Sequence, residues 1–516
     1  MNIKEFSKLT GILGILLLFF GCQGQKQGTS APNIIFLFAD DYTYDAIAAL
    51  GNGIIETPNL DRMVHQGTTF THAYNMGGWN GAICVASRSM IISGKHIWNA
   101  KNTISEWKRR DSTALNSTWG KLMESKGYNT YMTGKWHVDL PAKEVFGTVR
   151  NIRPGMPNDL RDMVDWNQIY KAFDQGKDVK AMTPPGYYRP VNEQDTMWTS
   201  SNPKFKGFWE GGKHWSEVVR DDALAFLQDA TQMTNPFFMY LAFNAPHDPR
   251  QAPQEFLDRY NVHDIPVPDN WLPEYPYKDA MNSGFTMRDE ALAPYPRTPF
   301  SLKTHLREYY AIITHLDHQI GEILDAVEAS GLKKETYIFF AGDHGLSVGH
   351  HGLLGKQNMF DHSIRVPLMV MGPDVPKGKK VTADVYLQDI MASSLDLAGI
   401  KKPDHVDFNS LIPLAKGERL QGHLDDGVYC AFEEESQRMI RKGGYKLIIY
   451  PKINKVLLFD LEEDPEEIDN LAEDPENKKR VVELFADLMA LQKKMNDPLD
   501  LGNLFETLSQ NDNTIR

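Results

Sequence analysis

One of the three cysteines in this chain lies in a stretch that could carry chemistry, GAICVASRSMIISGKH, from Gly81 to His96. Cys84 is surrounded by small residues, and Arg88 follows four positions later. A lone cysteine in such a setting is usually a small buried apolar side chain, but it can also be a nucleophile that neighbouring groups activate. The stretch alone leaves both interpretations open.

Polar side chains follow three apolar runs elsewhere in the sequence. Asp40 and Asp41 follow residues 34–39, His247 follows a run that starts at Phe237, and Asp343 with His344 follows a run that starts at Thr336. Continuous apolar runs of this length indicate buried strands of a parallel sheet, whose carboxyl ends share one edge and carry the ligand-binding groups. Asp40 and Asp41 alone could equally be a helix cap and a solvated neighbour.

The elements needed to position these groups are also visible in the sequence. Amphipathic patterns predict helices over residues 118–128 and 301–332, the second closed by Gly331. Two irregular segments, residues 141–208 and 264–299, have a length that is typical of functional or disordered loops. After Gly399, short strands around a Lys-Gly-Gly turn precede a helix expected over residues 477–495. We therefore predict an α/β fold with a large, mixed, mostly parallel sheet flanked by helices, and a smaller C-terminal antiparallel-sheet subdomain with a terminal helix. The predicted boundaries are a signal peptide at 1–21, a linker at 22–31, a catalytic domain at 32–405 and the C-terminal subdomain at 406–516.

The amino-acid composition limits the classes of molecule that the protein is expected to bind. The 516 residues carry a formal net charge of −13, which argues against nucleic acid, because phosphate binding depends on clustered Lys and Arg. An anionic substrate would have to meet a local positive charge.

The first residues are typical of an export signal. Lys4 and Lys8 precede a short apolar run from Leu9 to Gly21, and Cys22 follows directly. The Gly-Cys junction resembles a bacterial lipoprotein cleavage site, so we expect lipidation of Cys22 and attachment to a membrane through that anchor, in the periplasm or at the cell surface; a plain secretory signal is the alternative. Two cysteines then remain, and a Cys84–Cys430 disulfide stays open.

The segment CVASR, Cys84 to Arg88, resembles the signature of the type I sulfatases, a family of the alkaline-phosphatase-like superfamily. Four further segments follow in that family's order: ADD at residues 39–41, TGKWHV at 133–138, APHDP at 245–249, and AGDHG with LLGKQ between 341 and 357. YKLI and LFDLEEDPEEIDNLA near the C-terminus are also typical. The resemblance covers residues 32 to about 472.

This resemblance implies a complete reaction. A maturation enzyme would oxidise Cys84 to formylglycine, whose hydrate has one hydroxyl to attack sulfur and a second to expel sulfate. Arg88 would steady the hydrate and His137 would hydrogen-bond it, while Lys135 and Lys356 contact the sulfate and His247, with Lys356, protonates the leaving alcohol. The implied Ca²⁺ ligands are Asp40, Asp41, Cys84, Asp343 and His344.

The substrate is expected to be a sulfated oligosaccharide or polysaccharide. The GGWNGAICVASR context and the lipoprotein signal resemble sulfatases of polysaccharide-degrading Bacteroidetes-type bacteria, which favours an algal polysaccharide such as ulvan or carrageenan, with a glycosaminoglycan second. Aromatic residues around Tyr187, Trp198 and Trp209 suit sugar rings, and packing of loops onto the sheet is an equally open role for any one of them. We select His214 and Arg189 as substrate-binding candidates. Two other functions stay open: a phosphonate or phosphate monoester hydrolase of the same superfamily, and a catalytically silent glycan-binding lipoprotein.

Overall fold

The structure is a computed structural model that describes residues 31–157, 160–418 and 424–510. The predicted signal peptide, Cys22 and the linker up to residue 30 lie outside these residues. From Pro32 onward the chain forms one compact unit, which contains both of the predicted sheets. No helix of the described residues is both long and apolar enough to cross a bilayer.

The main sheet is centred on three strands that are buried along their whole length, β1 (Asn33–Ala39), β8 (Phe237–Ala242) and β9 (Thr336–Gly342). β1 runs parallel to both neighbours, and β4 (Asn129–Lys135) and β5 (Thr148–Arg153) extend the parallel part beyond β8. Strands covered on both faces need apolar side chains throughout. On the other side of β9 lie β11 (Leu368–Met371), β2 (Thr68–Tyr74), β10 (Arg365–Val366) and β12 (Lys379–Tyr386), with β11 antiparallel to β9 and β2.

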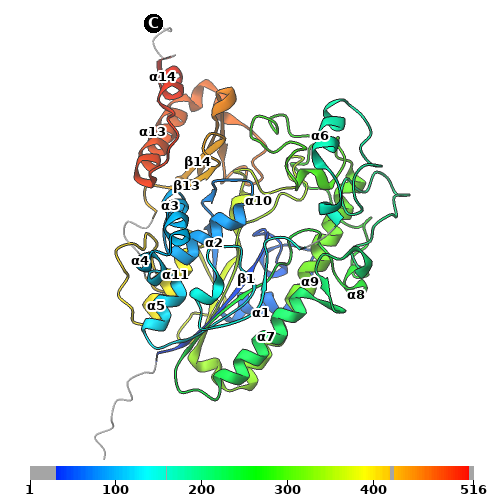
Figure 1. Cartoon of the computed structure of the whole chain (residues 1–516). Coiled ribbons are helices and arrows are strands. Elements are labelled where there is room, and N and C mark those ends of the chain that lie inside the picture. Colours follow the sequence, from blue (N-terminus) through cyan, green and yellow to red (C-terminus); the bar gives the residue numbers. More distant parts are fainter. Residues whose placement is uncertain (1–30, 158–159, 419–423, 511–516) are drawn as a thin grey trace, which may run out of the picture. The chain divides into compact units, whose positions relative to one another are not determined.

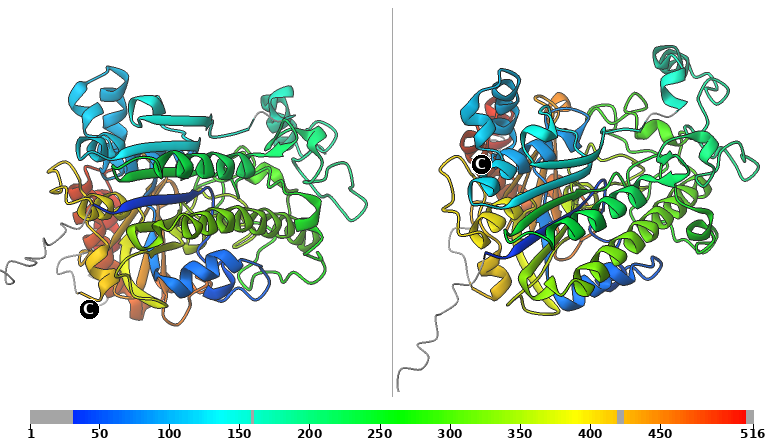
Figure 2. Two further views of the ribbon diagram at one scale, coloured as in Figure 1. Left: turned by 90° about the horizontal axis from the view of Figure 1, so that it is seen from below. Right: turned by 60° about the horizontal axis from the view of Figure 1, so that its bottom comes forward.

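Helices cover both faces of this sheet (Figures 1 and 2). α1 (Pro58–Gln66), α7 (Trp215–Ala230) and α9 (Pro299–Ala329) share a core with one face of β1, to which Ile35 and Leu37 contribute. On the opposite face, Trp119 packs against Phe36 and Phe238. The helices of that side are α2 (Ile83–Ser93), α3 (Ile97–Lys108), α4 (Ser112–Asn116), α5 (Trp119–Ser125) and α11 (Asp389–Leu397). The predicted α/β class is confirmed.

The long predicted helix is α9. Pro299 occupies its first turn, where a missing N–H costs nothing, and the side chain of Thr298 caps it by accepting a hydrogen bond from Ser301 N. The helix ends at Ala329, and Gly331 then adopts a left-handed φ of 76°. The predicted helix over residues 301–332 is therefore confirmed, with ends two to three residues earlier in the chain, and Gly331 follows its last turn as expected.

The C-terminal part forms the predicted antiparallel sheet. Its strands are β13 (Val428–Phe432), β14 (Gln437–Lys442), β15 (Tyr445–Tyr450) and β16 (Lys455–Asp460), with α13 (Lys478–Met495) packed against them. An unexpected member is β3 (Gly77–Gly78), which pairs with β13 and lies just before Cys84 in the sequence. Gly77 has φ 84°, and a Cβ there would lie 2.0 Å from Ala431 O. This close approach explains the glycine at position 77.

The two irregular segments pack against each other. Phe173 of α6 (Trp166–Asp174) stacks on Phe285 with ring centroids 3.9 Å apart, and Tyr188 N donates to Ala291 O at 2.9 Å. We call residues 160–206 and 264–298 together the wall. The remaining short elements are the hairpin β6 (Trp209–Glu210) and β7 (Lys213–His214), α8 (Gln254–Leu257), α10 (Asp361–Ile364), α12 (Ile412–Lys416) and α14 (Gly502–Gln510).

Candidate active site

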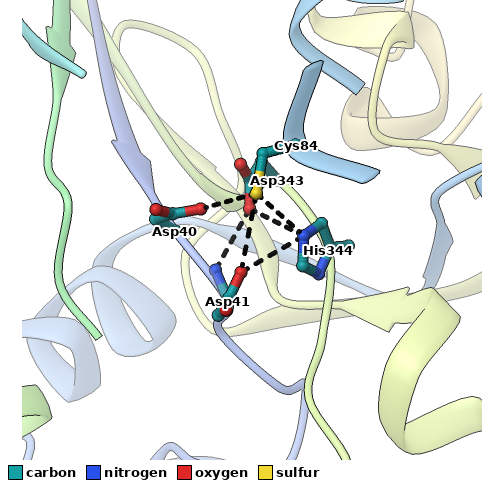
Figure 3. A group of neighbouring side chains, drawn as sticks. All are labelled: Asp40, Asp41, Cys84, Asp343 and His344. Carbon is teal, nitrogen blue, oxygen red and sulfur yellow. Dashed lines mark hydrogen bonds and ion pairs between the residues drawn. The ribbon is translucent and has the colours of Figure 1, made fainter. Parts of the chain in front are cut away.

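The site begins where β1 and β9 end side by side. Ala39 and Gly342 are paired in the sheet, so the residues that follow them, Asp40 and Asp343, come to the same edge. Asp41 turns the chain with a left-handed φ of 64°, a conformation that Asp tolerates better than most residues. Its backbone N donates to Asp343 Oδ1 at 3.1 Å, which fixes the two strand ends to each other (Figure 3).

Cys84 points into this group from the first turn of α2. Its Sγ lies 3.3 Å from Asp40 Oδ1, 3.4 Å from His344 Nε2 and 3.8 Å from Asp41 Oδ1. The side chain is buried, and the partial positive charge of a helix N-terminus favours an anion there. Both Cys84 and Cys430 are free, so the disulfide that the sequence left open is not formed.

Arg88 lies one helical turn after Cys84 and is fully buried. Its Nε donates to Asp343 Oδ2 at 3.0 Å and its Nη1 donates to Lys135 O at 2.8 Å. The guanidinium also lies over the ring of Phe38 at 4.6 Å. The observed bonds of Arg88 therefore brace a strand-end carboxylate, and its implied contact with a formylglycine hydrate stays a prediction.

The donor set fits a divalent cation. One donor atom from each of the five residues predicted as ligands lies within 4.8 Å of all the others, and all five residues are buried; they are Asp40, Asp41, Cys84, Asp343 and His344. Burial, together with the charges of Asp343 and Cys84, raises the pKa of Asp40 well above its usual value. Three carboxylates buried this closely repel one another, and a bound cation would relieve that repulsion. Their oxygens suit a hard ion such as Ca²⁺, while the His344 nitrogen is the softest member of the set.

Two lysines supply positive charge at the same point. Lys135, the last residue of β4, forms an ion pair with Asp40. Lys356 Nζ lies 2.8 and 2.9 Å from the carboxylate oxygens of Asp41 and 3.3 Å from Cys84 Sγ. Burial alone would raise the pKa of Cys84, but these lysines and His344 outweigh it, and the pKa lies well below its ordinary value. The site thus stabilises negative charge on the side chain at position 84.

His137 approaches Cys84 from the loop after β4. Its backbone has a left-handed φ of 51°, and its side chain hydrogen-bonds to that of Cys84. Nδ1 is buried and has no hydrogen-bond partner among the described residues. Burial lowers the pKa of His137, which keeps the ring neutral at pH 7, so it can both donate and accept.

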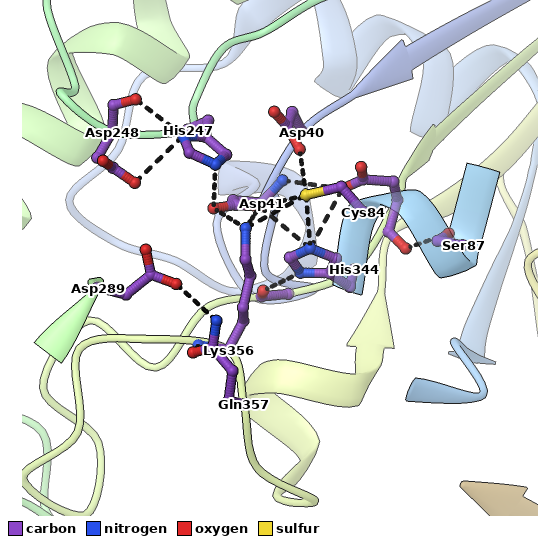
Figure 4. Close-up of polar contacts among 12 residues, drawn as sticks. Asp40, Asp41, Cys84, Ser87, His247, Asp248, Asp289, His344, Lys356 and Gln357 are labelled. Carbon is purple, nitrogen blue, oxygen red and sulfur yellow. Dashed lines mark hydrogen bonds and ion pairs between the residues drawn. The ribbon is translucent and has the colours of Figure 1, made fainter. Parts of the chain in front are cut away.

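His247 completes the site from the loop after β8 (Figure 4). Its Nε2 lies 3.8 Å from Asp41 Oδ2. Its Nδ1 lies 2.8 Å from Asp248 O and 3.1 Å from Asp248 Oδ1, so Asp248 fixes the orientation of the ring. Burial alone would raise the pKa of Asp248, but the charges of Arg288 and His247 outweigh it and hold the pKa well below its usual value. The structure brings all of the predicted catalytic and metal residues to one point.

The two substrate-binding candidates have other partners. His214 caps α7: its Nδ1 accepts from Ser216 N at 3.1 Å and its Nε2 lies 2.9 Å from Gln251 O. Arg189 forms a two-point salt bridge with Glu308, at 2.8 and 2.5 Å, and stacks on Trp198. Both are buried, and neither hydrogen-bonds to the five-residue cluster. Substrate binding by His214 and Arg189 stays a prediction that these contacts do not favour.

Four residues of the site were not selected from the sequence. Arg288 and Asp289 come from the wall, Asp248 follows His247, and Gln357 follows Lys356. Arg288 forms ion pairs with both Asp248 and Asp289, and Gln357 Nε2 donates to Asp289 Oδ2 at 2.8 Å. Asp248 and Gln357 lie within quoted motifs, while the charged run Arg288–Asp289–Glu290 was the only signal for the wall residues.

Comparisons with known proteins agree with this geometry. The sequence model of the Sulfatase family matches residues 32–400, and the model described as N-sulphoglucosamine sulphohydrolase, C-terminal, matches residues 349–494. An arylsulfatase of Clostridium perfringens is 30% identical over 87% of this chain and 92% of its own length. An N-acetylglucosamine-6-O-sulfatase of Bacteroides thetaiotaomicron is 25% identical, with 92% and 89% covered. An ulvan-active sulfatase of Formosa agariphila is 26% identical, with 76% and 66% covered.

A solved phosphonate monoester hydrolase from Silicibacter pomeroyi has the same fold. Its TM-score is 0.69 at 19% identity, over 90% of this chain and 96% of that one.

Proposed function

The chain belongs to the sulfatase family and is a sulfuric ester hydrolase, and we propose that it removes sulfate from a sulfated carbohydrate with a formylglycine made from Cys84 and a bound Ca²⁺. The observation that carries this proposal is the position of Cys84, buried at a helix N-terminus with its sulfur within hydrogen-bonding reach of Asp40, His344 and Lys356. The thiol sulfur occupies the place that an oxygen of the modified residue would take.

The two groups that are added to the chain supply distinct chemistry. A hydrated formylglycine offers one hydroxyl to attack sulfur and a second whose deprotonation expels sulfate. Ca²⁺, held by Asp40, Asp41, Asp343, His344 and the residue at position 84, would supply positive charge to the sulfate oxygens.

The chain's own residues then do four things. Lys135 pairs with Asp40 and Lys356 pairs with Asp41, and both lysines stabilise negative charge at the reacting centre. Arg88 holds Asp343 in place. His137, neutral and hydrogen-bonded to position 84, is placed to take a hydroxyl proton during the elimination of sulfate.

The fourth task is protonation of the leaving oxygen. When the S–O bond breaks, the electron pair stays on the bridging oxygen, and a sugar alkoxide is a poor leaving group unless it is protonated. Lys356 Nζ and His247 Nε2 both face Asp41, at 2.8 and 3.8 Å. We assign the proton donor to this pair.

The names of two relatives support a carbohydrate substrate, one an N-acetylglucosamine-6-O-sulfatase and the other an ulvan-active sulfatase. The proposed substrates are oligosaccharides of an algal polysaccharide such as ulvan or carrageenan, with glycosaminoglycan fragments second. The test is a desulfation screen of defined oligosaccharides from both classes, with Cys84→Ala as the inactive control. Release of sulfate from neither class, by protein shown to be modified at position 84, would refute the carbohydrate proposal.

A separate assay tests the phosphonate and phosphate alternative. Aryl sulfate, aryl phosphate and aryl phosphonate esters compared at equal concentration should show the sulfate turned over fastest. A faster phosphonate reaction would reverse the assignment.

We also propose export and lipid anchoring at Cys22, as the N-terminal sequence suggests. Fatty-acid labelling of wild type and Cys22→Ser in a bacterial host tests it: the label should enter the membrane fraction with wild type and be absent from the variant. Equal labelling would exclude Cys22 as the attachment point.

A further inference from the structure

Arg288 links the residues that surround the two candidate proton donors, His247 and Lys356. Its Nη1 forms an ion pair with Asp248 and its Nη2 forms one with Asp289. These carboxylates are 3% and 2% exposed, whereas the Arg288 side chain is 16% exposed, so the arginine is the outermost of the three groups. The Arg288 guanidinium therefore pairs with two buried carboxylates and lies nearer to the solvent than either of them.

The first branch of this network leads to His247. Asp248 Oδ1 lies 3.1 Å from His247 Nδ1, while its other oxygen pairs with Arg288. Nη2 of the same arginine lies 3.4 Å from His247 Nε2. Asp248, which Arg288 holds, thus fixes the imidazole through Nδ1, and when Nε2 carries the proton for the leaving oxygen it does not accept from Arg288.

The second branch leads to Lys356. Asp289 Oδ2 accepts from Gln357 Nε2 at 2.8 Å, and Gln357 Oε1 accepts from Lys356 N at 3.0 Å. Gln357 Nε2 also donates to Gly81 O at 3.0 Å, which ties this branch to the segment that precedes Cys84. A shift of the Asp289 side chain would therefore displace the backbone of Lys356 and the segment near the start of α2.

We propose that Arg288 is a positioning residue that fixes His247 and Lys356 relative to the leaving oxygen of the substrate. The proposal rests on the function proposed above and deepens it. Arg288 transfers no proton itself: as the S–O bond breaks, the proton on the departing oxygen comes from His247 or Lys356, and Arg288 sets where those donors stand.

The side-chain type matters. A guanidinium is a planar fork that can hold two carboxylates at once, whereas the ammonium of lysine is a point charge. Arg288→Lys keeps the charge but can hold Asp248 or Asp289 well, not both. It should therefore restore only part of what Arg288→Ala loses.

The test uses metal-loaded, formylglycine-containing full-length protein with two probes, 4-nitrophenyl sulfate and unsubstituted phenyl sulfate. Nitrophenolate departs without protonation, whereas the departure of phenolate depends more strongly on a proton donor. Arg288→Ala should lower kcat for phenyl sulfate by about 10- to 100-fold, as misplaced catalytic groups do, and lower it for nitrophenyl sulfate by much less. KM should change little on either probe. Arg288→Lys should fall between wild type and Arg288→Ala.

Arg220 provides a matched control. It also pairs with two carboxylates, Asp221 at 2.8 Å and Glu322 at 2.5 Å, and its side chain is 17% exposed, but it lies on α7 and contacts none of the catalytic residues among the described bonds. Arg220→Ala should leave the ratio of the two rates at the wild-type value.

The outcomes separate the alternatives. The proposal is overturned if Arg288→Ala lowers kcat equally on the two probes, or if a lowered melting temperature accounts for the loss of activity on both. Arg288 would then be a merely structural residue. A raised KM with unchanged kcat would make it a substrate-binding residue, which also overturns it. If modified wild type turns over neither probe, the proposed function itself fails.

Discussion

The Nζ of Lys356 and the Sγ of Cys84 lie 3.3 Å apart, and both side chains are buried. Nζ also holds both oxygens of Asp41, so the lysine touches the nucleophile position and a metal-ligand carboxylate at once. A cation placed in this way can respond to charge that develops at position 84 or on the substrate.

The first prediction concerns the modification of Cys84. Protein made with a formylglycine-generating enzyme should show the aldehyde in the peptide that spans Cys84 and should be active, whereas protein made without it should keep the thiol and be inactive. Mass spectrometry of that peptide, paired with the turnover of nitrophenyl sulfate, measures both. Full activity in a preparation that carries only the thiol would remove formylglycine from the mechanism.

The second prediction concerns the metal. Asp343→Asn keeps the shape of a side chain that accepts from Arg88 and Asp41 N but removes a charge from the cation site. It should lose bound Ca²⁺ and activity by roughly a thousandfold or more, the scale of several kcal/mol of charge stabilisation. His344→Asn should keep the metal, because an amide oxygen is an ordinary Ca²⁺ ligand. Elemental analysis and assays after chelation check both variants; wild type that stays fully active when stripped of metal contradicts the assignment.

Much of the fold and of the catalytic core could be predicted from the sequence, because the signals are local. β1, β8 and β9 are continuous apolar runs that each end in polar residues, and parallel strands bring such ends together. That rule places Asp40 and Asp343 at the same edge of the sheet, while the pairing of β1 with β9, which puts them side by side, appears only in the structure. The helix α2, which puts Cys84 and Arg88 on one side, was not predicted from the sequence.

Contacts between distant segments could not be predicted in this way. The pairing of Gly77 with Ala431, across more than three hundred residues, has no local signal. Lys446 likewise lies in the recognised YKLI motif, but its buried ion pairs with Asp361 at 2.5 Å and Glu467 at 2.6 Å appear only in the folded chain.

The same limit explains His214 and Arg288. His214 stands before a helix in a segment rich in aromatics, which suggested a binding role, yet the structure uses both ring nitrogens in backbone contacts. Arg288 stands in a proline-rich loop with no periodicity, and only the packing of the wall brings it to Asp248.

The third prediction is a pH dependence of stability. Asp317 on α9 accepts from the backbone N of Leu60 at 2.7 Å and of Asn59 at 3.1 Å, at the start of α1. Burial raises its pKa to about 6, from 3.8. Between these values the folded state keeps a proton that the unfolded chain has released, so this group's contribution to stability falls as pH rises from 4 to 6.

Asp317→Asn lacks that titration. The free energy of unfolding of wild type, relative to the variant, should therefore fall by on the order of 2 kcal/mol between pH 4 and pH 6, whatever the variant's stability at any one pH. Denaturant melts at several pH values measure this difference. A flat difference for Asp317→Asn would mean that its carboxyl titrates normally.

The last prediction separates leaving-group protonation from support of the nucleophile and metal. A sugar alcohol needs a proton to depart and nitrophenolate does not, so His247→Ala should lose about a hundredfold or more on a sulfated oligosaccharide and far less on nitrophenyl sulfate. Lys356 faces the same Asp41 carboxylate and shares the role, which would reduce the contrast. Arg88→Ala should impair both substrates alike, because Arg88 contacts Asp343 and Lys135 O rather than the departing oxygen. Steady-state kinetics of both variants on both substrates decide the matter: equal losses for His247→Ala would take the acid role from His247 and leave it to Lys356.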